Sequence, residues 1–172
     1  HNAYNALAAA SIGRIMDVPW EDIQRALAEF RPVSMRAEIV HKNEIVVIND
    51  CYNANPDSMS AALDLLGAVP GARKVAVLGD MLELGPRSGE FHAAVGAQVA
   101  ARADLVLATG SESKQLVAAA RSAGMDQDRA RHFESANQAG EYVAANLCCG
   151  DVVLVKASRA MALDQVVERI LQ

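Results

Sequence analysis

The sequence is poor in aromatic residues and cysteine, and it has no long uninterrupted apolar segment. Trp, Tyr and Phe make up 4% of the 172 residues, and there are three cysteines. No apolar run approaches the roughly 18 residues that suggest a membrane-spanning helix, so no span is predicted. Cys51 stands alone, whereas Cys148 and Cys149 are adjacent. An odd number of cysteines with no CxxC pair gives no disulfide framework, which favours reduced thiols in a cytoplasmic protein.

Basic residues are fewer than acidic ones: Lys and Arg number 16, and Asp and Glu number 21. The formal net charge is −5, whereas proteins that bind a nucleic-acid backbone usually carry a basic stripe. The histidines are far apart and show no metal-ligand spacing, so no metal site is predicted within this chain. The chain has neither an initiator Met nor a basic-then-apolar leader. We therefore expect part of a longer cytoplasmic protein, without a signal peptide, and a monomer.

Several well-known site motifs are missing. No GxGxxG follows a strand, so a dinucleotide site is not supported. No GxxxxGK[ST] is present, so this chain alone has no loop to cradle a triphosphate. No GxSxG elbow suggests a hydrolase. These absences argue against three kinds of site within this chain, and they do not bear on the class of fold.

Apolar residues are plentiful: 52% of the sequence is hydrophobic and 22% is charged. This composition predicts a globular protein with a core of Ala, Val, Leu, Ile and Met. Residues 2–16 read as a helix, and a second helix begins near Pro19 and ends before Arg31-Pro32. The composition shifts near 31–35, which predicts a domain boundary between residues 1–33 and residues 34–172.

The second part alternates between strand and helix patterns. A hairpin is predicted over 36–42 and 44–50, followed by strands at 73–78, 104–108 and 151–156 and a weaker one at 131–133. Helices are predicted at 57–68, 87–102, 112–123, 135–147 and 159–171. Near-continuous Val/Ile/Leu runs are typical of strands covered on both faces. The prediction is an α/β fold with a doubly wound, mostly parallel sheet, Rossmann-like but without the dinucleotide motif.

Polar residues gather where the strands end. Each of these loops, taken singly, reads as an ordinary turn, but four of the residues are charged: Asp50, Asp80, Lys156 and Arg159. The carboxyl ends of parallel strands share one edge of a sheet, where open α/β sheets bind ligands. Each loop also leads into a helix N-terminus, which favours anions. The pattern predicts a ligand site at this edge.

Five ordered motifs resemble the Mur ligases of peptidoglycan synthesis. They are His1-Asn2-x-x-Asn5, Arg36-x-Glu38, the run from Asp50 through Tyr52-Asn53-Ala54-Asn55-Pro56, the run Leu78-Gly79-Asp80-Met81-Leu82-Glu83-Leu84-Gly85, and Lys156-x-Ser158-Arg159. The resemblance covers essentially the whole chain. It implies a three-domain parent, of which residues 1–33 end the central ATPase domain and residues 34–172 form the C-terminal domain.

The resemblance also implies a reaction. ATP phosphorylates a carboxylate, and an amine attacks the acyl phosphate, with Mg²⁺ held mainly by central-domain residues outside this chain. YNANP and LGDMLELG are similar to the branch that joins D-alanyl-D-alanine to UDP-N-acetylmuramoyl-tripeptide. This chain alone is expected to be inactive. A folate-type polyglutamate ligase, disfavoured by YNANP, and a non-catalytic α/β binding module stay as alternatives.

Residue roles follow from the same resemblance. Arg36 is expected to be catalytic and to reach the ATP phosphates. The other expected ATP-binding residues are Asn2, Asn5, Asp50, Tyr52, Asn53 and Asn55. The amine substrate is expected to meet Asp80, Thr109, Gly110, Lys156, Ser158 and Arg159. Ser158 is further predicted to cap a helix that carries Arg159 in its first turn. The sequence departs from the family pattern at Ala157, where Gly is usual, and at Leu163-Asp164, where Met-Glu is common.

Overall fold

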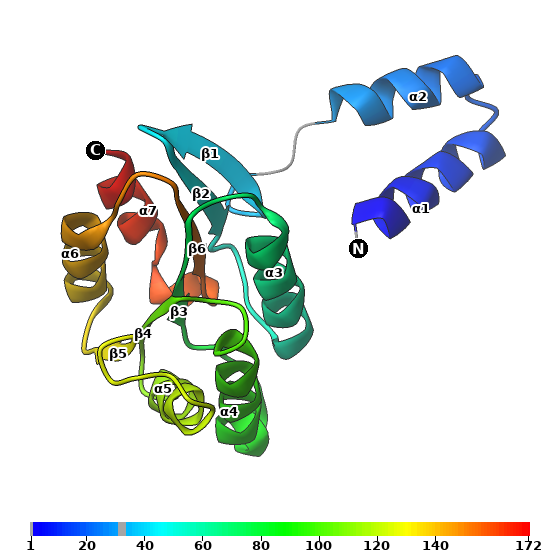
Figure 1. Cartoon of the computed structure of the whole chain (residues 1–172). Helices are drawn as coiled ribbons and strands as arrows, with labels where there is room; N and C mark the ends of the chain where they lie inside the picture. Colours follow the sequence, from blue (N-terminus) through cyan, green and yellow to red (C-terminus); the bar gives the residue numbers. More distant parts are fainter. Residues whose placement is uncertain (1, 31–33) are drawn as a thin grey trace. The chain divides into compact units, whose positions relative to one another are not determined.

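The computed structural model describes residues 2–30 and 34–172, and the chain divides into two compact units, His1–Pro32 and Val33–Gln172 (Figure 1). The boundary expected near 31–33 falls on residues outside the described ranges. No helix within those ranges is long and apolar enough to cross a membrane.

The first unit is a pair of helices, α1 (Asn2–Ile15) and α2 (Trp20–Glu29), as the sequence predicted. Pro19 is the residue before α2, in the extended conformation that suits a helix start. Gly13 lets the helices approach, because a Cβ there would lie 3.0 Å from Ile23 Cδ1. Few side chains are buried here, among them Ala10 and Ile23.

The second unit is built on a six-stranded sheet with the order β1-β2-β6-β3-β4-β5. Its strands are β1 (Glu38–Lys42), β2 (Ile45–Asp50), β3 (Arg73–Gly79), β4 (Leu105–Thr109), β5 (Ala130–Phe133) and β6 (Asp151–Lys156). β1 pairs antiparallel with β2, and the other pairings are parallel. The predicted hairpin and mostly parallel sheet are confirmed.

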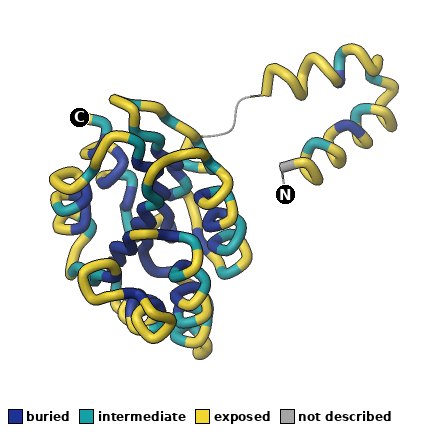
Figure 2. The backbone as a smooth tube through the Cα atoms, viewed as in Figure 1, coloured by how far each residue is buried: buried dark blue, intermediate teal, exposed yellow. Residues whose placement is uncertain are grey.

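Helices cover both faces of the sheet, and buried residues line its two sides (Figures 1 and 2). α3 (Pro56–Ala68), α4 (Ser88–Val99) and α5 (Ser113–Ser122) pack on one face, and α6 (Ala136–Asn146) and α7 (Asp164–Leu171) on the other. Strand residues alternate between the two cores: Ala76 and Leu78 join the first, and Val75 and Val77 the second. The interior strands β2, β3, β4 and β6 carry near-continuous apolar runs because neither face of them meets water.

The last predicted helix, 159–171, is wrong in its first turn. A 3₁₀ turn, η2 (Arg159–Met161), follows β6, and α7 begins only at Asp164. Ala162 separates them with a left-handed φ of 51°, which breaks the run of helical hydrogen bonds. A second 3₁₀ turn, η1 (Gly85–Arg87), precedes α4.

Candidate active site

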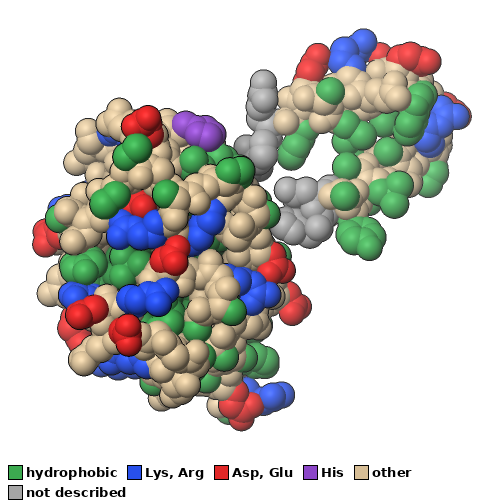
Figure 3. Space-filling view, viewed as in Figure 1, with side chains coloured by type: hydrophobic (Ala, Val, Ile, Leu, Met, Phe, Trp, Pro, Cys, Tyr) green, Lys and Arg blue, Asp and Glu red, His purple; other side chains and the backbone are tan. Residues whose placement is uncertain are grey.

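The loops after β2, β3, β4 and β6 meet at the carboxyl edge of the sheet, as predicted. β6 lies between β2 and β3, although it comes last in the chain. The sheet therefore reverses its strand order here, and such a switch point is where open α/β sheets form a crevice. Figure 3 shows Lys, Arg, Asp and Glu side chains interspersed on one face of this unit.

An ion pair between Lys156 and Asp50 joins the ends of the neighbouring strands β6 and β2. The two residues are partners in the parallel β2–β6 register, and Lys156 Nζ lies 2.6 Å from Asp50 Oδ2. Nζ also donates to the Asn53 carbonyl oxygen at 2.9 Å. The Lys156 side chain is only 2% exposed. The contact between Lys156 and the amine substrate stays a prediction; in this structure the ammonium is enclosed and bound to internal acceptors.

Arg36 lies on a strained turn that the other oxygen of Asp50 helps to hold. Met35 and Ala37, on either side of Arg36, have φ values of 64° and 51°, a left-handed conformation that costs a non-glycine residue roughly 1–2 kcal/mol. Ala37 N donates to Asp50 Oδ1 at 2.9 Å. The Arg36 side chain is exposed, and its guanidinium carbon lies 4.0 Å from the centre of the Tyr52 ring.

The loop after β2 is ordered by its asparagines. Asn55 Oδ1 accepts from Ser58 N at 2.8 Å, and Ser58 Oγ accepts from Asn55 N at 3.0 Å, which forms a capping box at the start of α3. Asn53 Oδ1 accepts from Ala54 N at 2.8 Å. Tyr52, Asn53 and Asn55 are all exposed. These three side chains therefore lie on the solvent-exposed side of the loop at the carboxyl edge of the sheet, and the Tyr52 ring contacts Arg36.

Cys51, at the start of the same loop, is unsuited to act as a nucleophile. Its thiol is buried and donates to the Val155 carbonyl oxygen at 3.3 Å. Burial, reinforced by the negative charges of Asp164 and Asp50, raises the pKa of Cys51 to about 12. The thiolate is thus nearly absent at neutral pH.

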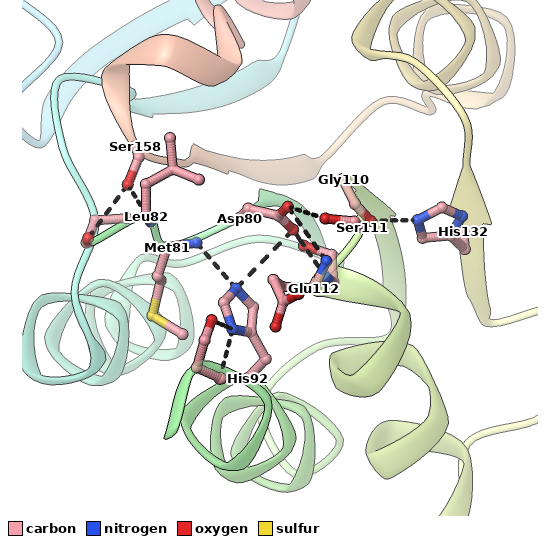
Figure 4. Close-up of polar contacts among 12 residues, drawn as sticks. Asp80, Met81, Leu82, His92, Gly110, Ser111, Glu112, His132 and Ser158 are labelled. Atoms are coloured by element: carbon pink, nitrogen blue, oxygen red, sulfur yellow. Dashed lines mark hydrogen bonds and ion pairs between the residues drawn. The ribbon is translucent and has the colours of Figure 1, made fainter. Parts of the chain in front are cut away.

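Asp80, after β3, is engaged by the helix opposite it (Figure 4). Its Oδ1 accepts from Ser113 N at 2.8 Å and from Ser113 Oγ at 2.7 Å, and Oδ2 accepts from Glu112 N at 3.2 Å. Asp80 is 3% exposed. In this structure the Asp80 carboxylate caps the N-terminus of α5, where negative charge is favourable, and its contact with the amine substrate stays a prediction.

Thr109 and Gly110 bring β4 close to Asp80. Thr109 is buried. Gly110 has a φ of 113°, and a Cβ there would lie 2.3 Å from the Asp80 carboxylate. The Gly110 carbonyl oxygen accepts from His132 Nε2 at 2.7 Å. Gly110 is thus required by backbone conformation and by close approach, and the contacts of Thr109 and Gly110 with the amine substrate stay predictions.

His92, which the sequence analysis did not single out, supports the loop after β3 from below. The ring is fully buried on α4, and its Nε2 accepts from Met81 N at 2.9 Å. Its Nδ1 lies 2.8 Å from the Ser88 carbonyl oxygen. Because a carbonyl only accepts, the proton belongs on Nδ1 and the ring is neutral. A polar residue on an otherwise apolar helix face was the available signal.

Ser158 ties three loops together. Its Oγ accepts from Leu82 N at 2.9 Å and lies 3.5 Å from the Ala54 carbonyl oxygen, and its own N donates to the Asp80 carbonyl oxygen at 3.1 Å. It makes no side-chain cap to η2, so the predicted N-cap role is wrong. Ser158 is 5% exposed and positions the Leu82 backbone.

Arg159 is the exposed cation at the end of β6. Its Nη1 lies 2.9 Å from Asp164 Oδ2, and 53% of the side chain is exposed. It does not lie in the first turn of α7, so the predicted conflict with that helix dipole does not arise. Among the residues expected to meet the amine substrate, Arg159 combines charge with access.

Two of the predicted ATP-binding residues belong to the first unit. Asn5 is exposed on α1, whereas the Asn2 side chain lies outside the described part.

The comparisons with known proteins agree with this architecture. The family model described as "Mur ligase, glutamate ligase domain" matches residues 35–159. The chain is 34% identical to UDP-N-acetylmuramoyl-tripeptide--D-alanyl-D-alanine ligase of Bacillus subtilis, over 100% of the chain and 38% of that protein. The chain therefore belongs to the Mur ligase family, and it spans well under half the length of this relative.

Solved structures show the same similarity. MurF from Acinetobacter baumannii superposes with a TM-score of 0.90 at 27% identity, covering 99% of this chain and 38% of that one. MurF ligase from Thermotoga maritima, solved in complex with ADP, gives a TM-score of 0.77 at 28% identity and covers 93% of this chain and 35% of that one.

Proposed function

We propose that this chain is the C-terminal part of a cytoplasmic, ATP-dependent ligase. The ligase joins D-alanyl-D-alanine to UDP-N-acetylmuramoyl-tripeptide through an acyl phosphate. The observation that carries the proposal is the exposed guanidinium of Arg36, held on a strained turn above the buried Asp50–Lys156 pair. Strain at an exposed cation marks a position under functional constraint. The family and the relatives above supply the reaction class.

The β2 side of the edge forms the nucleotide half of the proposed site. Arg36 is the cation for the phosphates, since guanidinium charge stabilises the transition state of phosphoryl transfer. Tyr52, Asn53 and Asn55 offer an aromatic face and amide groups on the exposed side of the loop. Asp50 is proposed to bind the ribose of ATP. It already accepts from Ala37 N and pairs with Lys156, so this role would add to a structural one.

The β6 side forms the amine half. Arg159 can present two parallel N–H groups to the dipeptide carboxylate, the geometry that guanidinium and carboxylate share. Asp80, Thr109, Gly110, Lys156 and Ser158 form the rigid support behind it, since each is buried or held by internal hydrogen bonds. We propose that these five residues position the loops of the amine half and that Arg159 contacts the dipeptide carboxylate directly.

The remaining parts of the active site are proposed to lie outside residues 34–172. Residues 1–33 would end the central ATPase domain, with Asn5 and Asn2 near the adenine. Mg²⁺ would be held mainly by residues beyond this chain; within the described ranges no group of three or more His, Cys, Asp or Glu side chains could hold a metal ion. ATP supplies the activated phosphoryl group when bound.

A substrate-exchange assay on the full-length protein tests the proposal. ADP formation is measured with UDP-N-acetylmuramoyl-tripeptide and D-alanyl-D-alanine, then with the dipeptide replaced by L-glutamate, and finally with a folate in place of the nucleotide tripeptide. We expect turnover that needs both peptidoglycan precursors, and a pentapeptide product detected by mass. Turnover with folate and glutamate would instead establish the folate-type alternative. No turnover with any pair would favour a binding module.

A further inference from the structure

Glu38 is part of the Arg36-x-Glu38 motif, but the proposed reaction gives it no role. It begins β1, and its side chain is only partly exposed. It points back onto the turn of residues 34–37 that precedes the strand, hereafter the Arg36 turn. The Glu38 carboxylate therefore contacts residues that precede it in the chain.

One oxygen of Glu38 gathers the Arg36 turn. Glu38 Oε2 accepts from Ser34 Oγ at 2.9 Å, from Met35 N at 3.2 Å and from Asn49 Nδ2 at 3.1 Å. The first two donors belong to the turn, and the third belongs to β2. The carboxylate therefore fastens the turn to the sheet at a point just before Arg36.

Three further contacts complete the clamp. Ala37 N donates to Asp50 Oδ1 at 2.9 Å on the far side of Arg36, and Tyr52 N donates to the Met35 carbonyl oxygen at 3.1 Å. The Tyr52 ring lies against the guanidinium itself, 4.0 Å from its carbon. The strained backbone at Met35 and Ala37 would relax without such restraints, because left-handed φ values persist in non-glycine residues only where the surroundings enforce them.

From this arrangement we infer that Glu38 is a positioning residue for Arg36, acting with the Tyr52 ring. Glu38 fixes the backbone of the Arg36 turn, and Tyr52 fixes the direction of the side chain. Neither is required to touch the transferred phosphoryl group. The inference rests on the proposed role of Arg36, and it explains why an exposed arginine has a defined place on the turn.

A kinetic cycle in the full-length protein tests the inference. Glu38→Ala should lower kcat by about 10- to 100-fold, as misplacing a catalytic group by about an ångström does, while the KM for D-alanyl-D-alanine stays within about twofold of wild type. Glu38→Gln should recover part of the rate, because an amide oxygen has two lone pairs and can accept two of the three hydrogen bonds. In an Arg36→Ala background, Glu38→Ala should cause no further loss, since its effect passes through Arg36. The exposed Glu168 on α7 provides the control, and Glu168→Ala should leave kcat unchanged.

A spectroscopic readout separates this inference from the proposed function. A guanidinium over the face of an aromatic ring has its Nε–H proton resonance shifted upfield, and this can be measured by NMR in the present chain. The shift should persist in Tyr52→Phe and Glu38→Gln and disappear in Tyr52→Leu and Glu38→Ala, with unchanged far-UV circular dichroism in all four. An inactive wild-type enzyme would refute the proposed function but leave this pattern intact. An unmoved Arg36 resonance in Glu38→Ala, or a kinetic loss that adds fully to that of Arg36→Ala, would overturn the inference.

Discussion

Removing one charge of the pair formed by Lys156 and Asp50 should destabilise the fold far more than removing both. Asp50→Asn keeps the size of the side chain and the acceptor for Ala37 N, but it removes the negative charge. Lys156 then keeps a cation on a side chain that is 2% exposed. Lys156→Met removes the cation instead and leaves Asp50, with a side chain 17% exposed, to find water more easily.

The magnitude follows from the separation and the burial. At 2.6 Å, the gross attraction is about 6 kcal/mol for an effective dielectric constant of about 20. Desolvation opposes it, so the pair adds little net stability, whereas breaking it by removing one partner costs about 3–5 kcal/mol. We expect that loss for Asp50→Asn, and a smaller one for Lys156→Met because Asp50 is less enclosed. The double variant should lose only about 1–2 kcal/mol, mostly from unmade hydrogen bonds.

Urea unfolding of the chain, followed by circular dichroism, measures these differences. With a slope of about 2 kcal/mol per molar urea, Asp50→Asn should lower the midpoint by about 2 M. The exposed Arg87–Glu90 pair, 67% exposed at both side chains, is the matched control, and Glu90→Gln should cost less than about 1 kcal/mol. A loss below 1 kcal/mol for Asp50→Asn, or a double variant as unstable as the two single losses added together, would refute the reasoning.

Three further outcomes follow from the site. Gly110→Ala should destabilise the chain by about 2–3 kcal/mol in urea unfolding, because it adds backbone strain at φ 113° and a clash with a buried carboxylate. The control Gly67→Ala, in helix α3 with open space around it, should be neutral or slightly stabilising in the same experiment. Ser158→Ala should lower the free energy of unfolding by about 1–3 kcal/mol, because Leu82 N loses its acceptor. Ser158→Thr keeps a hydroxyl acceptor, so near wild-type stability in that variant would support this cause. In the folded chain the pKa of Cys51 is about 12, against 9.0 for the ordinary thiol. Between pH 9 and 12 the unfolded chain therefore loses this proton while the folded chain keeps it, and the free energy of unfolding falls by about 1.4 kcal/mol per pH unit. Urea titrations at several pH values should show this extra slope in wild type and not in Cys51→Ala.

The sequence predicted the sheet well because its signals are local. Continuous apolar runs identified the buried strands. The short edge strand β5 was also found, although only weakly. Local patterns carry this information because strands that are covered on both faces have no polar residues to interrupt them.

The roles of the charged residues could not be read in the same way. Lys156 and Asp80 follow strands just as a ligand-binding residue would, yet one pairs with Asp50 and the other caps α5 from a distant loop. Those partners are 106 and 33 residues away along the chain, so no local pattern reveals them. The start of α7 was misplaced because Ala162 takes a left-handed φ of 51°, which its residue type does not predict.

The central claim is that this edge of the sheet presents two cations to two different substrates. Steady-state kinetics of Arg36→Ala and Arg159→Ala in the full-length protein test it most directly. We predict that Arg36→Ala lowers kcat by about 100-fold or more with little change in the KM for D-alanyl-D-alanine. Arg159→Ala should raise that KM by about 10- to 100-fold, the loss of a charged hydrogen bond, and leave the KM for ATP nearly unchanged. Equal changes in both substrates' parameters for the two variants, or no change in either, would contradict the account.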